Sequence, residues 1–486
     1  MIFVSVFSNF FSVGRMVKPE NIRGEIPASG QAYKDLMKIA LPSVIEMVFV
    51  SLIGSVDMVM LRWLDDPAAA IAAVGLAGQP RMITLSMFFA LNVGVTAIVA
   101  RRRGQNRRED ANRALRNAII IVLALAAIVI TASLIWARPL LLLAGAQADT
   151  IEMSHDYFRI LTYFMPISAL TMCINAAQRG VGNTRTTMYV NLTSNVVNAI
   201  LNLLLIYGVK GRSGEYVIPA MGVAGDAWAT GTGICVGFIM CLFSIMGKRN
   251  ADGFLHLSLR DNWRLHKETV KSVVKIGGNA MIEQGAMRIG FFVYAMIVAS
   301  LGTRAVAAHQ VGMQFLNLSF TFGDGLAVAA TSLVGQMLGK ERPDLATIYG
   351  TCAQRIAVCG GIVLATLIAL FRQPLVSIFL DTSIVANLES FVMAMNVLLI
   401  VGLFQPIQMS NVVISGCLRG AGDNLHVAMI MIICVVFIRP ILSFTAVNFL
   451  HLGLIGAWSA SLIDMSIRLS LMFKRFKGGK WQLKKV

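Results

Sequence analysis

Long apolar segments recur along the whole chain, and they constrain the fold more than any other feature of the sequence. A helix needs about 20 mostly apolar residues to cross a bilayer. Only 14% of the 486 residues are charged, whereas a soluble protein has about 25%. Twelve segments are long and apolar enough, namely 39–61, 68–100, 117–136, 157–178, 187–208, 224–246, 273–300, 306–335, 351–371, 390–416, 425–446 and 453–472. We therefore predict an all-α integral membrane protein with twelve transmembrane helices, whose even number places both termini on one side.

Basic residues gather in loops that follow even-numbered segments and in the C-terminal tail. The clusters are Arg101, Arg102, Arg103, Arg107 and Arg108; Lys248, Arg249, Arg260, Arg264, Lys267 and Lys271; and Lys474, Arg475, Lys477, Lys480, Lys484 and Lys485. The other loops carry fewer, chiefly Arg62, Arg138, Lys210, Arg212, Arg304 and Arg372. Because loops rich in Lys and Arg stay in the cytoplasm, we expect both termini to be cytoplasmic in a cell (inner) membrane. Topology and anionic lipids account for the net charge of +17, so no nucleic-acid partner is expected.

The cysteines and the first residues suggest no disulfide, metal site or signal peptide. Seven cysteines lie inside apolar segments without CxxC spacing: Cys173, Cys235, Cys241, Cys352, Cys359, Cys417 and Cys434. We expect them to be small core residues. The opening "MIFVSVFSNFFSV" lacks a leading charge and a small-residue cleavage site, so a cleaved signal peptide is not expected. It is either an interfacial helix or the product of an upstream start codon, with Met16 as the ordinary start.

Four short sequences recur at nearly the same displacement. "AIVARRRGQNRRED" (97–110) matches "SLVGQMLGKERPD" (332–344), and "IAAVGL" (71–76) matches "VAAHQV" (306–311), both 235 residues apart. "QRGVGNT" (178–184) returns as "LRGAGDN" (418–424) after 240 residues, and "GVAGDAWA" (222–229) as "GLIGAWSA" (453–460) after 231. Six spans therefore repeat as six spans, which predicts two six-helix bundles related by a pseudo-two-fold axis along the membrane normal.

The repeat sets the expected domains. We predict a cytoplasmic leader (1–38), an N-terminal lobe (39–246), a cytoplasmic linker (247–272), a C-terminal lobe (273–472) and a basic cytoplasmic tail (473–486). Two such lobes are a common basis for alternating access, in which a site opens to one side and then to the other. Prolines inside the spans permit bending; these are Pro42, Pro80, Pro166, Pro406 and Pro440.

An ordered set of sequences resembles the multidrug and toxic compound extrusion (MATE) family. It comprises "LPSVIEMVFVSLIGSVDMVM", "AAVGLAGQ", "VARRRGQNRREDA", "QRGVGNTRTTMYVNLTSNVVNAILNLLLIYG", "GVAGDAWAT", "IEQGAMRIGFFVYAMIVASLGTRAVAAHQVGM" and "LVGQMLGKERPDLA". The likeness extends from about residue 35 to 472. It implies a secondary antiporter, in which inward H+ or Na+ drives the export of amphipathic, often cationic organic compounds.

Asp57 is a carboxylate in the middle of the first span. An ionised Asp at the bilayer centre is costly, about 2.5–3.5 kcal/mol on insertion scales, and usually faces protein or water on a transport pathway. Glu46 lies eleven residues earlier, which at about 100° per residue places both acids on one stripe of the helix. The resemblance matches Asp57 to the family's span-1 aspartate, an element of the N-terminal cation site. Glu46 is a secondary candidate.

The fifth span carries a row of amides. Asn191, Asn195, Asn198 and Asn202 share one helix face, where they either join helices or supply oxygen ligands to Na+. The resemblance matches Asn198 and Thr230 to site residues, whereas Asn202 stands where many members have aspartate. Asp226, one turn before Thr230, is a candidate replacement for the missing acid, although it lies near a helix start, where a carboxylate often serves as a cap.

The C-terminal half offers a second set of polar candidates. The resemblance matches Glu283 to a coupling glutamate, while Gln408 stands where one branch of the family has aspartate. Glu283 has an alternative role as a structural ion pair with Arg288. Asp324 and Arg439 are expected in internal polar contacts, His309 in the core, and Gln310 as a secondary polar candidate.

These residues lead to one mechanism and one alternative. We expect Asp57 to be the main cation-responsive group, coupled to H+ by preference, or to Na+ held with Asn198, Asn202 and Thr230. We expect no enzyme activity and no cofactor, because the chain has no GxxxxGK[ST] sequence or catalytic constellation. The expected partners of the monomeric protein are amphipathic or cationic drugs and membrane lipids. The alternative is a lipid-linked glycan or lipid flippase of the same superfamily, for which we would expect more arginines inside the spans.

Overall fold

The computed structural model describes residues 10–64, 66–148, 150–210, 215–247, 253–258, 260–380 and 388–484. The first nine residues and four predicted basic residues, Arg212, Lys248, Arg249 and Lys485, lie outside these ranges. Eleven helices in the described ranges are long and apolar enough to cross a membrane, and a bent pair, counted as one span, makes twelve. This result agrees with the twelve predicted spans.

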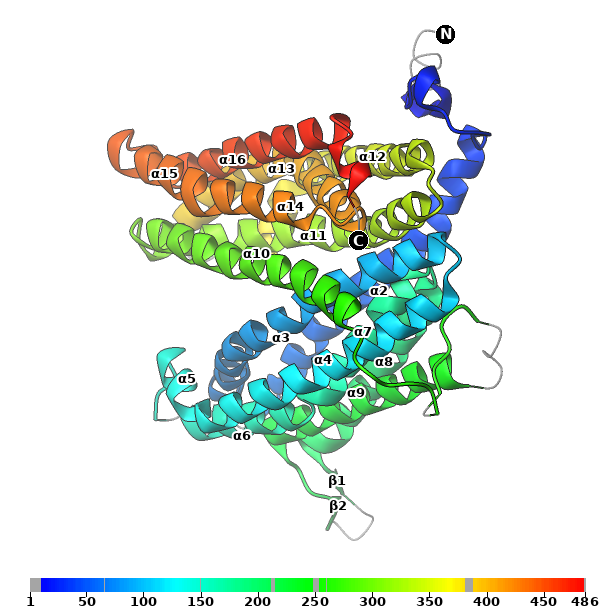
Figure 1. The fold of residues 1–486 in the computed structure, drawn as a ribbon. Helices are drawn as coiled ribbons and strands as arrows, with labels where there is room; N and C mark the ends of the chain where they lie inside the picture. Colours follow the sequence, from blue (N-terminus) through cyan, green and yellow to red (C-terminus); the bar gives the residue numbers. More distant parts are fainter. Residues whose placement is uncertain are drawn as a thin grey trace. The chain divides into compact units, whose positions relative to one another are not determined.

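Helices make up almost the whole described chain (Figure 1). The first eight after the N-terminal segment are α2 (Ser29–Leu61), α3 (Pro67–Gly104), α4 (Arg108–Ile135), α5 (Ala137–Leu143), α6 (Ile151–Tyr163), α7 (Met165–Gly180), α8 (Thr184–Tyr207) and α9 (Gly222–Met246). They are followed by α10 (Lys267–Ala299), α11 (Thr303–Gly339), α12 (Pro343–Ser377), α13 (Leu388–Gly420), α14 (Asn424–Met431), α15 (Arg439–Phe444) and α16 (Gly453–Lys477). A short antiparallel hairpin, β1 (Val209–Lys210) and β2 (Tyr216–Ile218), joins α8 to α9.

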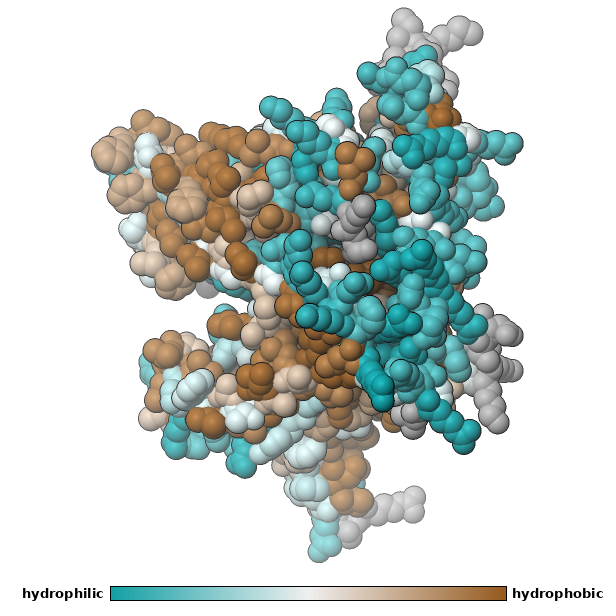
Figure 2. All heavy atoms as spheres, viewed as in Figure 1, coloured by the Kyte–Doolittle hydropathy of each residue, from teal (hydrophilic) through white to brown (hydrophobic). Residues whose placement is uncertain are grey.

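The chain forms two compact units. The N-terminal unit is Ile45–Gly277, and the C-terminal unit combines Met1–Val44 with Gly278–Val486. The division falls inside α2 and inside α10, whereas the predicted lobe boundaries follow the ends of spans. Within the C-terminal unit, apolar side chains cover the parts of α10, α15 and α16 away from the chain terminus, and hydrophilic side chains gather near that terminus (Figure 2).

The repeated "RGxG" sequence forms the same helix end in both units. Gly182 and Gly422 have φ of 86° and 84°, the left-handed conformation that closes a helix with little strain only at glycine. The preceding glycines allow close packing. A Cβ on Gly180 would lie 2.9 Å from the Thr96 carbonyl oxygen, and one on Gly420 would lie 2.3 Å from that of Thr331. These glycines therefore serve turns and packing.

Proline accounts for the main breaks in the spans. α6 and α7 meet at a 50° bend at Phe164, where Pro166 in the first turn of α7 has no N–H to continue the preceding helix. Pro440 lies between two π-helical stretches, Ile432–Ile438 and Thr445–Phe449. The other three predicted prolines, Pro42, Pro80 and Pro406, lie inside continuous helices.

Candidate functional site

Asp57 and Asn202 are joined by a hydrogen bond inside the N-terminal unit. Asn202 on α8 is fully buried, and its Nδ2 donates to Asp57 Oδ1 on α2 at 2.8 Å. Glu46, three turns earlier on α2, accepts hydrogen bonds from Thr187 and Asn191 of the same helix α8. Both acids of α2 therefore face α8, as their spacing predicts.

Asn198 connects this contact to α9. Its side chain is buried and lies 3.0 Å from the Thr230 hydroxyl. With its amide oriented so that Oδ1 accepts from Thr230, its Nδ2 donates to Asp57 Oδ1 at 3.2 Å. This orientation satisfies both ends of the amide, so two amides of α8 donate to the same carboxylate. The four predicted residues of the N-terminal site, Asp57, Asn198, Asn202 and Thr230, therefore form one cluster.

Asp226 supplies a second carboxylate to the cluster. It is 1% exposed, lies beside Asn202 and the Tyr157 hydroxyl, and is close enough to Asp57 for their charges to interact. It is not a cap, because α9 begins four residues earlier. Asp226 Oδ1 and Asn202 Oδ1 are both buried without a hydrogen-bond partner among the described residues. Asp226 of α9 thus lies beside Asn202 of α8, the position where many members of the family have aspartate.

Close packing of α8 on α9 brings these side chains together. Gly225, Gly233 and Gly237 share one face of α9. A Cβ on Gly225 would lie 2.5 Å from the Leu205 carbonyl oxygen, and one on Gly233 would lie 2.6 Å from that of Ser194. Small residues permit such close approach between membrane helices. The glycine face therefore places Asp226 and Thr230 against Asn198 and Asn202.

The arrangement suits a proton or a monovalent cation. Neither Asp57 nor Asp226 forms an ion pair among the described residues, and Arg81 of α3 is a positive side chain that acts electrostatically on both. Two ionised acids in an apolar surrounding require a compensating positive charge. Carboxylate, amide and hydroxyl oxygens are the ligands that hard cations prefer. The unpartnered oxygens of Asn202 and Asp226 could therefore bind a proton or a monovalent cation.

Glu46 belongs to a separate ion pair. It is 2% exposed and pairs with Arg179 of α7, while Asn191 donates to it at 2.6 Å and Thr187 at 2.9 Å. Its carboxylate is thus fully engaged by neighbouring side chains. The sequence-based candidates lack Arg179, although the "RG" that recurs after 240 residues marks it and Arg419.

The C-terminal unit repeats this ion pair at Glu283. The partner of Glu283 is Arg419 of α13, and the suggested pairing with Arg288 is wrong. Five residues correspond to about 140° around a helix, so Arg288 is on another side of α10, where it is exposed. Glu283 corresponds to Glu46, and Arg419 to Arg179, at displacements of 237 and 240 residues.

The remaining polar candidates do not gather around Glu283 in the described contacts. Gln310 and Asp324 of α11 are exposed. Gln408 is 1% exposed, and its Oε1 has no hydrogen-bond partner in the described part of the chain. His309 is buried between the rings of Tyr294 and Trp458, as expected for a core residue.

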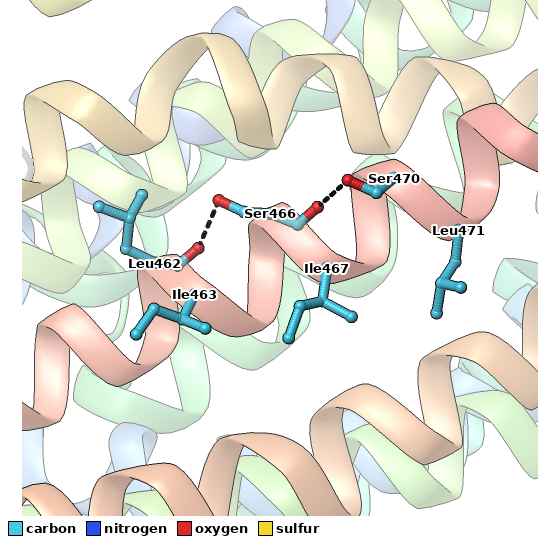
Figure 3. A pocket seen from close by; sticks show the side chains of 6 residues that line it. All are labelled: Leu462, Ile463, Ser466, Ile467, Ser470 and Leu471. Atoms are coloured by element: carbon cyan, nitrogen blue, oxygen red, sulfur yellow. Dashed lines mark hydrogen bonds between the residues drawn. The ribbon is translucent and has the colours of Figure 1, made fainter.

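A shallow groove of about 480 Å³ lies along one face of α16 and is distinct from the polar cluster. Figure 3 shows its lining residues, which are Leu462, Ile463, Ser466, Ile467, Ser470 and Leu471. Ser466 and Ser470 donate to carbonyl groups one turn earlier, each at 2.8 Å. The lining has no titratable group and its hydroxyls are already engaged, so we assign the groove no part in cation coupling.

Repeated helical bundles with a polar site between apolar spans are typical of multi-pass membrane transporters, and this chain has both features. The model of the MatE family matches residues 42–204 and 280–445, and the chain belongs to this family of transporters, which are not enzymes. The two matched ranges correspond to the two repeats.

Individual relatives match over almost their whole length. The "Probable multidrug resistance protein NorM" of Thermotoga maritima is 27% identical over 459 residues, which are 93% of this chain and 94% of that protein. A MOP superfamily transporter from Pyrococcus furiosus, described as having a binding pocket of reverse polarity, has a TM-score of 0.84 at 21% identity and covers 93% of this chain and 97% of its own. An outward-facing multidrug resistance MATE family transporter has a TM-score of 0.82 at 21% identity, with 92% and 97% covered. These structures share the fold of this chain.

Proposed function

We propose that the protein is a secondary active multidrug efflux transporter, which exchanges H+ for amphipathic, often cationic organic compounds by alternating access. The observation that carries the proposal is the cluster of Asp57 and Asp226 with Asn198, Asn202 and Thr230. It provides a group that changes charge at membrane depth. The names of relatives such as NorM support drug export as the direction of transport.

The orientation of the amides favours H+ over Na+. Asn202 turns an N–H toward Asp57 Oδ1 at 2.8 Å, and Asn198 does so at 3.2 Å when its amide oxygen accepts from Thr230. To bind Na+ at Asp57 Oδ1 itself, both amides would have to turn their N–H groups away from that oxygen. A proton needs no such rotation, because it can bind a carboxylate oxygen directly.

Exchange follows if the cation and the organic compound favour opposite-facing states, since only differential affinity shifts a conformational equilibrium. When one H+ is exchanged for one uncharged compound, the net inward charge at 100 mV provides about 2.3 kcal/mol. At ~1.4 kcal/mol per tenfold ratio, this energy sustains a concentration ratio of about 50. The lobes (39–246 and 273–472), joined by the linker 247–272 and flanked by the leader and tail, are proposed as the moving parts.

The test uses the purified protein in proteoliposomes with ethidium as the fluorescent cation. A pH gradient and a Na+ gradient are imposed separately. We expect the pH gradient to drive ethidium transport and the Na+ gradient to leave it unchanged. Transport driven by the Na+ gradient alone would show that Na+, and not H+, is the coupling ion at this site. No transport with either gradient would overturn the proposed function and favour a flippase.

Variants locate the coupling group. We expect Asp57→Asn to lower the gradient-driven rate at least tenfold, and Asp226→Asn to do so in part, because each removes one of the paired carboxylates. Asp156→Asn is the matched control, since the side chain of Asp156 is 66% exposed, and its rate should not change. Unaltered gradient-driven transport in Asp57→Asn would refute the role of Asp57.

We also propose that the protein is a monomer in the cell (inner) membrane with both termini in the cytoplasm. The support for this orientation is the concentration of basic residues in loops after even-numbered spans. Basic residues at the membrane surface would also contact anionic lipid headgroups.

A further inference from the structure

A buried group of charges in the C-terminal unit has no part in the proposed transport mechanism. Asp464 of α16 is fully buried and forms ion pairs with Arg439 at 2.8 Å and with Arg468 at 2.6 Å. Arg439 and Arg468 are 2% and 3% exposed. We call Arg439, Asp464 and Arg468 the buried triad. One acid balances only one of its two bases.

No other acid in the described chain supplies the missing negative charge. The charged groups that act on Arg439 are Asp464 and Arg468. The other buried carboxylates of this unit are engaged elsewhere: Glu283 with Arg419, Asp344 with Arg342, and Asp423 with Arg475 and Lys484. Because burial of an unpaired charge is strongly unfavourable, the triad requires a further anion.

Hydrogen-bond donors surround the triad. The Arg439 guanidinium lies 5.8 Å from the centre of the Tyr294 ring, and the Tyr294 hydroxyl lies next to that of Ser461. Neither hydroxyl meets a partner with hydrogen-bond geometry in the described chain, and the same is true of Arg468 Nε and of one acceptor, Asp464 Oδ1. Tyr294 and Ser461 are 4% and 2% exposed. Buried donors normally have acceptors.

The helices arrange these groups toward one another. Ser461, Asp464 and Arg468 follow a spacing of three and four residues on α16, which places them on one side of the helix. Arg439 begins α15 directly after the π-helical stretch Ile432–Ile438. π-Helical segments often mark functional sites, and α15 packs against α16.

We propose that the buried triad, with the hydroxyls of Tyr294 and Ser461, binds a small monovalent anion of the size of chloride. The anion would accept hydrogen bonds from the guanidinium and hydroxyl groups and would bring the net charge of the site to zero. A small anion is proposed because the donor residues Arg439, Arg468, Tyr294 and Ser461 are each only 2–4% exposed, so the site is enclosed.

The test is the thermal unfolding of the full-length protein in detergent, at fixed pH and ionic strength, with chloride, bromide, formate or gluconate as the sodium salt. We expect chloride and bromide to raise Tm in a saturable manner, because a ligand that binds only the folded state stabilises it. Comparison of the Tm in formate with the Tm in chloride shows whether the site binds a small carboxylate as well as a halide. Gluconate is too large and should have no effect. Equal Tm values in chloride and gluconate would show that water alone satisfies the donors and would overturn the proposal.

Arg439→Gln and Asp464→Asn should change the chloride dependence of Tm in opposite directions. Arg439→Gln makes the triad neutral, so the halide dependence should disappear, with an apparent affinity at least tenfold weaker. Asp464→Asn raises the net charge to two, so Tm should fall in gluconate and rise more steeply with chloride. Arg288→Gln removes an exposed arginine and should behave as the unaltered protein.

Two further measurements keep the proposal testable if Arg439→Gln does not fold. Arg468→Gln neutralises the triad in the same way and should also abolish halide dependence. In the unaltered protein, bromide should give an anomalous scattering peak beside Arg439 in crystals. Halide dependence that persists in a folded neutral-triad variant would overturn the assignment. None of these measurements depends on transport, so their failure leaves the proposed function untouched.

Discussion

The acidic site candidates Glu46, Glu283, Asp57 and Asp226 fall into two groups that differ in their partners. Glu46 and Glu283 each pair with an arginine at the end of a repeated sequence, whereas Asp57 and Asp226 share amide and hydroxyl contacts without an ion pair among the described residues. A carboxylate held by an arginine gains little from a proton or cation. The unpaired acids are therefore the better candidates for coupling, and Glu283 is better regarded as a structural residue.

Loss of the Glu46 carboxylate should destabilise the protein. In Glu46→Gln, Arg179 loses its partner, and removing one member of a buried ion pair costs about 3–5 kcal/mol. Because the Arg179 side chain is 23% exposed, we expect a loss at or below the lower limit of this range, about 2–3 kcal/mol. The measurement is thermal or denaturant unfolding in detergent. Glu152→Gln breaks the exposed Arg138–Glu152 pair and should change stability by less than about 0.5 kcal/mol. Equal losses in both variants would contradict a buried structural pair.

The sequence predicts individual site residues better than it predicts their partners. Asp57 is conspicuous because it is an acid in an apolar span, and its helical spacing from Glu46 correctly indicates a shared face. Asp226 was difficult to assign, since its position near a helix start also suits a cap. The partner of Glu283 was missed because Arg419 lies 136 residues away, and local spacing carries no information about such contacts.

Helix α9 shows how an element positions the site. Its glycine face meets α8 so closely that Gly233 leaves no room for a methyl group beside the Ser194 carbonyl. The same contact fixes the separation of Thr230 from Asn198. Packing of α9 on α8 therefore links the stability of the N-terminal unit to the geometry of the polar cluster around Asp57.

Gly233→Ala should lower the stability of the N-terminal unit and disturb the geometry of the polar cluster around Asp57. The added Cβ would lie 2.6 Å from the Ser194 oxygen, and overpacking of this kind typically costs about 1–3 kcal/mol. We expect a lower unfolding temperature and slower ethidium transport. Gly285→Ala in α10 is the control, because nothing lies within 4 Å of its added Cβ; it should be neutral or stabilising by up to about 1 kcal/mol. If Gly233→Ala is as stable and as active as the unaltered protein, the close approach of α8 and α9 is not required for stability or transport.

Hydropathy predicts where the spans lie, but it does not predict their internal geometry. All twelve predicted spans overlap the helices and the bent pair found in the structure. Pro166 correctly indicated the break between α6 and α7. The distortion at Phe371 was not predicted, although Pro374 follows it by three residues, and the π-helical stretches beside Pro440 depend on packing that no periodic pattern reveals.

For the whole molecule, the bent pair α6 and α7 decides the membrane topology. If the pair crosses the membrane as one span, every basic cluster from the α3 end to the C-terminal tail falls on the same side. If it is a re-entrant segment, the loop with Arg260 and Arg264 changes to the side opposite Arg101–Arg103. The positive-inside rule therefore favours one crossing.

Single cysteines test this topology with a membrane-impermeant maleimide. Gln105→Cys and Asn183→Cys replace exposed residues after α3 and α7, and Glu215→Cys replaces an exposed residue in the α8–α9 connection. We expect Glu215→Cys to react in intact cells, and the other two only after permeabilisation, because the loops alternate between the two sides. The unaltered protein, whose seven cysteines are all free and none of them fully exposed, is the control for background labelling. Reaction of Asn183→Cys in intact cells, with Gln105→Cys still protected, would show that α6 and α7 return to the side from which they enter.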